Sequence, residues 1–416
     1  GYEKPADGFG LRGAGFDTVP GGEGILKVRR INIAERLSRI TGQGLYHHAV
    51  RAGRPVPIKN PVLNAGVTGQ DTAVAVAHDG KLRWFWGDTS LWQQPLGHFG
   101  TSTATAPLDT DPAVGIDLTY AVNSAGRCRA TFDLGRPGPV WVHGGFVLDG
   151  RILTQYERVT PEMKRLEVGI AEFDAKTETF TPVVQLDLKE ERHPYGQPFR
   201  AVLDGVDYLY FALPYPFLRV RATRDDVLDP AKYEAFTCLR GTYDAARPDV
   251  VRSDGQAVYA WRPGAVPVLP DRQEEMIKAG HLKPEEAWIR TLDAATGRPI
   301  KLHRGSVRWN EHRKRWVMIA SRIMGEESVL GDVHYAEAER PEGPWPKSVK
   351  VVGHRKYTFY NPVHHAFFDR EGGRIIHFEG TYTTAFSGND AATPRYEYNQ
   401  ILYRLDLDDP RLAPAR

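Results

Sequence analysis

Residues 68–90 read TGQDTAVAVAHDGKLRWFWGDTS, in which two hydrophobic runs flank an Asp79-Gly80 pair. Asp-Gly between apolar segments is a strong short-range signal for a two-residue β-hairpin turn. If these two residues form the turn, Asp71 pairs with Asp88. Directly opposed residues have Cβ atoms roughly 4.5–5.5 Å apart, and like charges there destabilise the pair. Two carboxylates placed in this way indicate proton chemistry, a metal or a substrate.

The hairpin pattern recurs along the chain. Asp149-Gly150 and Asp204-Gly205 mark the turns of the second and third copies, and residues 310–314 and 369–373 form those of the fourth and fifth. Five similar antiparallel units are typical of the blades of a propeller. The sequence therefore predicts an all-β fold, a five-bladed β-propeller with an N-terminal extension and a short helical insertion. Most copies are followed by a further strand-like run, at residues 166–173, 257–261, 333–338 and 400–405.

Three parts are expected along the 416 residues. Residues 1–60 form an extension that packs on or caps the propeller, or closes a blade, and Ile33–Ile40 within it predicts a helix. Residues 61–406 form the catalytic propeller, in which the polar segment 271–288 is a helical insertion. Residues 407–416 form a C-terminal tail, which we expect to be loosely held.

Composition narrows the class of protein. The net charge is +2 and no basic run stands out, which argues against nucleic acid as a partner. No segment resembles a transmembrane span, and we expect a secreted or periplasmic protein. The 18 Tyr, 17 Phe and 9 Trp residues provide aromatic surfaces for sugar rings. Cys128 and Cys238 allow at most one disulfide. The oligomeric state stays open.

The first strand of each blade lines the channel of a propeller. The start of that strand and the end of the second strand therefore meet at one face. Polar groups from all five units gather there, and we take the carboxylates Asp71, Asp88 and Glu379 as catalytic candidates. The substrate-binding candidates are His143, Arg200, Arg304, Arg322, Asn361, His364, Tyr382 and Trp92.

Two carboxyl groups around a glycosidic bond can divide the work of hydrolysis. One stays protonated and acts as the acid, while the other activates water or attacks carbon. Each candidate also has a structural alternative. The aspartates could form Asx turns at strand ends, the arginines could form ion pairs, and the histidines could be hydrogen-bonded core groups.

The same residue types bear on metals and cofactors. No cofactor is required by acid–base hydrolysis. No HExxH motif or Cys cluster suggests zinc, and we assign no metal ligands. The alternative left open is a structural Ca²⁺ ion in the channel, with water completing its shell.

Several segments resemble a known family. GQD (69–71) with FWGDT (85–89), GHFGTS (97–102), and NPVHH (361–365) with YNQILYRL (398–405) are similar to five-bladed propellers long known as a domain of unknown function. That family includes the endo-D-arabinanases of glycoside hydrolase family 183. YAEA (335–338) with GPW (343–345) separately resembles family 43 propellers. The resemblance covers residues 66–406, most densely at the two ends. It implies that Asp71 and Asp88 are the two acidic catalytic residues and that hydrolysis inverts the anomeric centre.

We therefore expect a glycoside hydrolase that cleaves furanosidic linkages in an arabinan-like polysaccharide, with the two aspartates as acid and base. One alternative is a polysaccharide lyase with a Tyr or His base, in which Arg304 or Arg322 neutralises a uronate carboxylate. Another is a non-catalytic carbohydrate-binding propeller, in which Asp71 and Asp88 bind a cation or cap strands.

Overall fold

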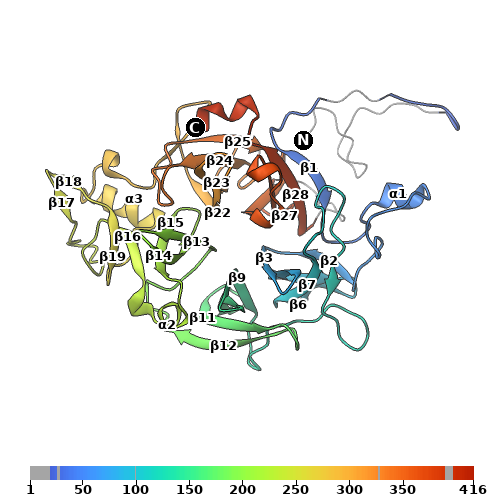
Figure 1. Ribbon diagram of the computed structural model, residues 1–416, viewed down its shortest axis with the longest axis horizontal. Helices are drawn as coiled ribbons and strands as arrows, with labels where there is room; N and C mark the ends of the chain where they lie inside the picture. The colour runs from blue at the N-terminus through green and yellow to red at the C-terminus, as the bar shows by residue number, and fades with distance from the viewer. Residues whose placement is uncertain (1–18, 26–28, 99, 327, 389–396) are drawn as a thin grey trace.

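A computed structural model describes residues 19–25, 29–98, 100–326, 328–388 and 397–416 (Figure 1). Phe99 of the GHFGTS segment lies outside the described residues. Five β-sheets surround a central axis, so the predicted five-bladed β-propeller is confirmed. Contacts between the first strands of neighbouring blades close a ring around the channel. In chain order these inner strands are β3 (Ala73–His78), β9 (Val140–Leu148), β13 (Gln197–Leu203), β22 (Leu302–Asn310) and β26 (Thr358–His364).

Each blade adds further strands outside its inner strand. Blade 1 continues with β4 (Lys81–Trp86), β7 (Ser102–Pro107) and β8 (Thr119–Tyr120). Blade 2 continues with β10 (Arg151–Val159), β11 (Arg165–Asp174) and β12 (Thr179–Leu186). Blade 3 continues with β14 (Val206–Ala212), β15 (Pro216–Arg221), β16 (Glu234–Thr237) and β19 (Ala260–Pro263).

The last two blades are built in the same way. Blade 4 continues with β23 (Arg315–Arg322), β24 (Val333–Ala338), β25 (Lys347–Val352), β20 (Thr291–Asp293) and β21 (Pro299–Ile300). Blade 5 continues with β27 (Ile375–Thr383), β28 (Asn399–Asp406) and β1 (Glu35–Arg39).

Smaller elements lie outside the blades. The short strands are β2 (Val67–Gln70), β5 (Thr89–Leu91), β6 (Gln94–His98), β17 (Arg252–Ser253) and β18 (Gln256–Ala257). The α-helices are α1 (His47–Arg51), α2 (Arg224–Leu228) and α3 (Pro270–Lys278), and the 3₁₀ turns are Pro230–Lys232, Pro284–Glu286, Ala366–Phe368, Glu371–Gly373 and Pro410–Ala415. Among the described residues, no helix has the length and apolar character needed to cross a membrane.

The hairpin register is the one expected from the Asp-Gly turn. Ala73 pairs with Trp86, and the pairing continues down to the turn. Asp79 (φ 48°) and Gly80 (φ 67°) both adopt the left-handed conformation that a type I′ turn requires. The Asp149-Gly150 and Asp204-Gly205 turns have the same signs of φ, which confirms the second and third hairpins.

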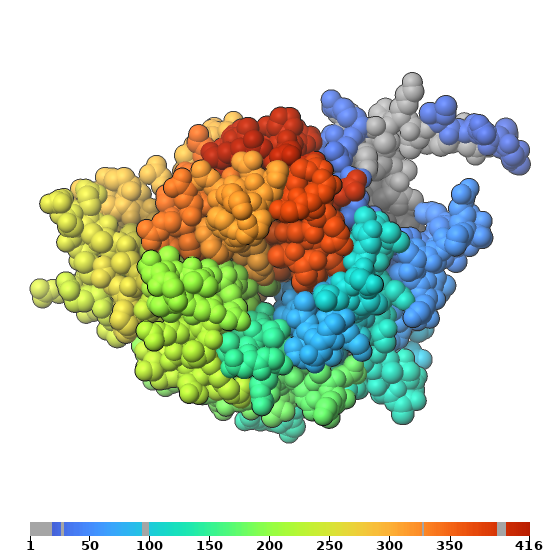
Figure 2. Space-filling model, viewed as in Figure 1, coloured from blue at the N-terminus to red at the C-terminus, as the bar shows by residue number. Residues whose placement is uncertain are grey.

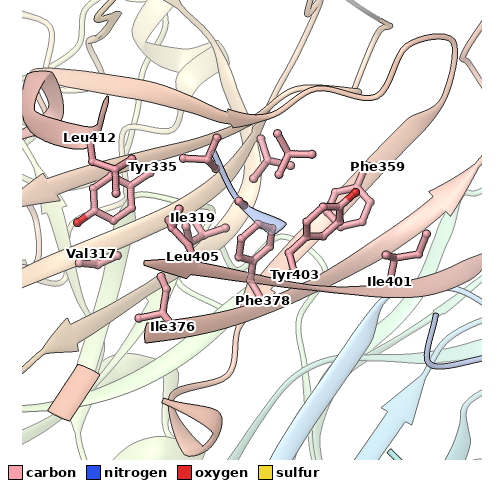
Figure 3. Packing of buried hydrophobic residues seen from close by; sticks show 14 of the residues in the cluster. Val317, Ile319, Tyr335, Phe359, Ile376, Phe378, Ile401, Tyr403, Leu405 and Leu412 are labelled. Carbon is pink, nitrogen blue, oxygen red and sulfur yellow. The ribbon is translucent and has the colours of Figure 1, made fainter. Parts of the chain in front are cut away.

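Apolar side chains fill the spaces between adjacent blades. Successive residues of β4 point to opposite faces, so Trp84 packs towards blade 5 and Phe85 towards blade 2. Between blades 4 and 5, side chains from β23 and β24 meet side chains from β27 and β28 (Figure 3). Burial of these layers is the main favourable term that fixes the blades around the channel.

Two expectations about peripheral segments were wrong. Ile33–Ile40 contains strand β1 and no helix, because the open edge of β28 takes up its backbone groups, with Glu35 paired to Arg404. The strand-like run at residues 257–261 falls in part on β18, in a separate two-stranded sheet, and on β19, the outermost strand of blade 3. The C-terminal segment is not loose, because Leu412 is fully buried against blade 4 (Figure 3). The helical insertion at 271–288 is present in part, as α3 and one 3₁₀ turn.

Candidate active site

A small pit lies in the channel, and all five inner strands or the turns before them contribute to it. The blades meet around a narrow central opening (Figure 2). The pit has a volume of about 20 Å³, which is enough for a water molecule. A ligand much larger than a water molecule could therefore bind only across its mouth. The polar lining residues come one from each blade: Thr72, His143, Gln197, Arg304 and Asn361.

Asp71 and Asp88 lie together beside this pit. The Asp71 N–H donates to the Asp88 carbonyl oxygen over 2.9 Å, and the Gly87 N–H donates to the Asp71 carbonyl oxygen over 2.9 Å. The pairing expected from the hairpin register therefore reaches both aspartates. Thr72, between Asp71 and β3, has φ 44° and interrupts the regular ladder at this point.

The surroundings of Asp88 favour its protonated form. Burial and the negative charge of Asp71 raise the pKa of Asp88 to about 6. One side chain acts in the opposite direction, because the Trp141 indole N–H donates to Asp88 Oδ1 over 2.8 Å. A carboxyl group with this pKa can carry a proton in mildly acidic solution.

Asp71 has more partners that favour its charged form. Burial raises its pKa above the ordinary value, whereas the Thr72 and Tyr360 hydroxyl groups and the charge of Arg304 lower it. The Thr72 hydroxyl donates to Asp71 Oδ1 over 2.6 Å and accepts from Asn361 Nδ2 over 2.6 Å. These three residues form a directed chain of hydrogen bonds from blade 5 to blade 1.

Asn361 is positioned by an unusual backbone conformation. Its φ is 52°, and the pairing of β26 with β27 shifts register between Tyr360 and Val363. The side chain is buried, and its Oδ1 accepts no hydrogen bond among the described residues. Asn361 is thus a pit-lining residue with a buried acceptor that lacks a partner among the described residues.

A second set of contacts holds Arg304 and His143 on the opposite wall. Arg304 donates to the Tyr195 hydroxyl over 2.6 Å, and the Tyr195 ring lies 4.3 Å from the His143 ring. His143 Nε2 lies 2.8 Å from Glu157 Oε1, and Arg165 donates to Glu157 Oε2 over 2.9 Å. Together these contacts fix both pit-lining side chains.

The charge states on this wall differ from one residue to the next. Burial lowers the pKa of His143, which leaves a neutral imidazole at the pit. Burial alone would raise the pKa of Glu157, but His143 and Arg165 outweigh it and lower that pKa to about 2. The ionised Glu157 acts against the effect of burial on His143, because its charge and hydrogen bond raise the His143 pKa.

Glu379 does not reach the pit. It is fully buried on β27, where its Oε1 accepts from the Trp84 indole over 3.1 Å and lies 3.0 Å from His365 Nε2. Tyr382, also on β27, stacks on Tyr357 with ring centroids 4.4 Å apart. Side chains of second strands face neighbouring blades and not the channel, which explains both positions.

Three other candidates also lie away from the pit. His364 is at the far end of β26, where its Nε2 lies 2.7 Å from Asp369 Oδ1. Arg200 is exposed and pairs with Asp207, near the Asp204-Gly205 turn. Arg322, on second strand β23, has its Nη1 3.8 Å from Asp293 Oδ2. The two arginines form ion pairs and His364 is a hydrogen-bonded core group, as the structural alternatives stated.

Trp92, the remaining predicted substrate-binding residue, lies in the β5–β6 hairpin, outside the five blades. It stands at the tip of the β5–β6 hairpin, with 64% of its surface exposed. It lines a separate groove and not the pit.

The structure places further side chains at the site that are not among the predicted site residues, including Thr72, Trp141, Tyr195, Gln197 and Tyr360. Trp141 follows the first residue of β9 and so stands at the same end of the channel as Asp88, which the propeller register could have indicated. Tyr195 lies in the connection between β12 and β13, where no strand pattern marks it.

The described side chains give no support to a metal site. Among the described residues, no three His, Cys, Asp or Glu side chains converge to hold a metal ion. The pit offers oxygen atoms of Thr72, Gln197 and Asn361 beside the guanidinium of Arg304, a donor set unlike that of a calcium site. Cys128 and Cys238 are buried free thiols. The channel Ca²⁺ ion stays a prediction.

Comparison with known proteins gives similarities of fold only. No protein-family model matches the chain, and no curated protein matches it. A structure from Bacteroides ovatus ATCC 8483 is 12% identical, with a TM-score of 0.49 over 90% of this chain and 94% of that chain. A thermostable family-43 glycoside hydrolase is 12% identical, with a TM-score of 0.38 over 83% and 91%. An exo-1,5-α-L-arabinanase from a bovine ruminal metagenomic library is 10% identical, with a TM-score of 0.42 over 82% and 94%.

Glu379→Ala should reduce stability. The substitution leaves a cavity and removes the acceptor of the buried Trp84 N–H, so the free energy of unfolding should fall by about 2–5 kcal/mol. Urea denaturation measures this change. Turnover per folded molecule should stay near that of the wild type. An inactive variant of unchanged stability would show that Glu379 takes part in the reaction.

Proposed function

We propose that the protein is a glycoside hydrolase that cleaves furanosidic linkages in an arabinan-like polysaccharide, with Asp71 and Asp88 as its catalytic carboxyl pair. The observation that carries this proposal is the different environment of the two adjacent carboxyl groups beside a polar pit. Environments that push two titratable groups apart are a general sign of an acid and a base. The choice of arabinan depends on the family resemblance of the sequence and not on the shape of the pit.

The contacts of each group suggest which role it takes. Asp71 has two hydroxyl partners and the nearby charge of Arg304, all of which favour the ionised form. Asp88 has only the Trp141 N–H to favour ionisation, against burial and the charge of Asp71. We therefore assign Asp88 as the general acid and Asp71 as the general base.

The reaction then proceeds with its protons balanced. Asp88 donates its proton to the glycosidic oxygen as the bond from that oxygen to the anomeric carbon breaks. A water molecule attacks the anomeric carbon from the opposite face and gives a proton to Asp71, which is the inverting course that the resemblance implies. The products are a hemiacetal and an alcohol. Proton exchange with solvent restores both carboxyl groups.

The other pit residues would orient water and sugar. Burial raises the pKa of Asp71, whereas the Thr72 hydrogen bond and the Arg304 charge act against this rise. The free Oδ1 of Asn361 and the side chains of His143 and Gln197 face the pit, where they can bind hydroxyl groups. Positioning of this kind supplies part of the rate by fixing the reacting atoms at a productive distance.

The form of the lyase alternative that uses a tyrosine base is less well supported. That base must remove a proton from carbon, and Tyr195 is the tyrosine that Arg304 contacts. Burial raises the pKa of Tyr195, and its hydroxyl accepts a hydrogen bond from Arg304. A tyrosine with a raised pKa is a poor base near neutral pH.

Asp71→Asn and Asp88→Asn should each lower turnover by roughly 10²–10⁴-fold, because each removes one partner of the acid–base pair. The measurement is reducing-end release from arabinans, fructans, galactans and uronic-acid polymers, with ultraviolet absorbance as the test for unsaturated lyase products. Arg200→Met is the matched control, since Arg200 pairs with Asp207 away from the pit. Near-wild-type turnover in both Asn variants would show that the pair is not catalytic.

The pH dependence should follow the two carboxyl groups separately. Because the acid must be protonated, kcat/KM of the wild type should fall as pH rises through about 6. Trp141→Phe removes the N–H that stabilises ionised Asp88, so this fall should move to higher pH. Arg304→Met removes a charge that stabilises ionised Asp71, so the acidic side of the profile should also move to higher pH.

Arg322→Met serves as the control for these profiles, because Arg322 also lies in blade 4 but pairs with Asp293. Its profile should match that of the wild type. If Trp141→Phe shifted the acidic side instead, the roles assigned to the two aspartates would be reversed.

A further inference from the structure

A second recess, larger than the pit, lies beside the small β2–β5–β6 sheet. It has a volume of about 540 Å³, against about 20 Å³ for the pit. A volume of several hundred Å³ is usual for a small-molecule site. Its lining includes Leu63, Ala65, Leu91, Trp92, Gln93 and Arg127, and we refer to it as the Trp92 groove.

The chemistry of the Trp92 groove suits a sugar ring. The Trp92 indole is 64% exposed, whereas Trp84 and Trp86 of the same blade are completely buried. The electron-rich face of an indole attracts the slightly positive C–H groups on one face of a sugar. Arg127 donates to the Gln93 side-chain oxygen over 2.5 Å, which places a guanidinium and a carboxamide at the edge of that platform. Such groups can bind the hydroxyl groups around the ring.

The groove and the two aspartates are joined by one pair of strands. β2 ends at Gln70, directly before Asp71, and β5 begins at Thr89, directly after Asp88. The two strands pair from Gln70–Thr89 to Val67–Leu91. At the end of this strand pair away from the aspartates, the backbone N–H of Trp92 donates to the Gly66 carbonyl oxygen over 2.8 Å.

The length of this ribbon sets the separation of the two sites. Asp88 and Trp92 are four residues apart, which corresponds to about 13 Å at the usual rise of a strand. That distance exceeds the length of a single sugar ring, so a ligand that reaches both places must be a chain. The hydrogen-bonded ribbon keeps the two places at a fixed distance.

We propose that the Trp92 groove is a distal subsite, which holds the substrate glycan several sugar units from the bond that is cleaved. This inference rests on the function proposed above and deepens it, because it makes a long chain the preferred substrate. The indole binds one sugar face, and Gln93 and Arg127 bind its hydroxyl groups. Short oligosaccharides that fill only the pit mouth gain nothing from this groove.

Binding measurements on uncleaved glycans test the proposal. The background is Asp88→Asn, which should slow turnover enough for binding to be measured, and the probes are disaccharides and long oligosaccharides of arabinan, fructan and galactan. Adding Trp92→Ala should weaken binding of the long chains about tenfold, equal to a loss of 1.4 kcal/mol, and leave disaccharide binding unchanged. Isothermal titration calorimetry measures both.

Trp309→Ala in the same background is the matched control. Trp309 is also exposed, at 39%, but lies beside the turn of blade 4. It should change neither affinity. If Trp92→Ala weakened both chain lengths equally, or neither, the distal subsite would be refuted while the hydrolase proposal stood. If the Asp88→Asn protein bound none of these glycans, the proposed function would fail and the subsite with it.

Discussion

The backbone pairing of Asp71 with Asp88 is the constraint on which the rest of the candidate site depends. The left-handed turn at Asp79 and Gly80 sets the register of that hairpin, and the interblade layers on both sides of β4 hold it in place. A shift of one residue would exchange the faces of every side chain in the strand. Trp84 and Phe85 would then lose their separate core layers. Stability of the propeller and placement of the carboxylates are therefore fixed by the same contacts.

Two carboxyl groups that lie close together repel each other when both are ionised. Side chains of the other blades determine which of the two is ionised more readily. Blade 4 supplies Arg304, and blade 5 supplies Tyr360 and the chain from Asn361 through Thr72, all on the side of Asp71. Blade 2 supplies only the Trp141 N–H to Asp88. Asp71 therefore has more contacts that favour ionisation than Asp88 has, and the proposed acid–base hydrolysis depends on a difference of this kind. Residues from four of the five blades are needed to build it, and a circular array of blades brings them to one place.

Much of this arrangement could be predicted from the sequence, because Asp-Gly turns and apolar alternation are local signals. They were sufficient for the five blades, for the hairpin register, and for the positions of His143, Arg304 and Asn361 at the pit. Glu379, Arg322 and Tyr382 were misplaced, because sequence does not show that side chains of second strands face the neighbouring blades. Strand β1 was mistaken for a helix, because its partner β28 lies at the other end of the chain. Tyr195 was missed, because a connection without periodicity gives no signal.

The proposed mechanism requires that Asp88 keep its proton to a higher pH than Asp71 in the free protein. Nuclear magnetic resonance titration of ¹³C-labelled aspartate side chains measures this order, with Asp71→Asn and Asp88→Asn proteins to assign the signals. Asp88 should titrate near pH 6 and at a higher pH than Asp71, and the pKa of Asp88 should fall in the Asp71→Asn protein. An Asp88 signal that titrates at about 4, the ordinary range for an aspartate, would contradict it.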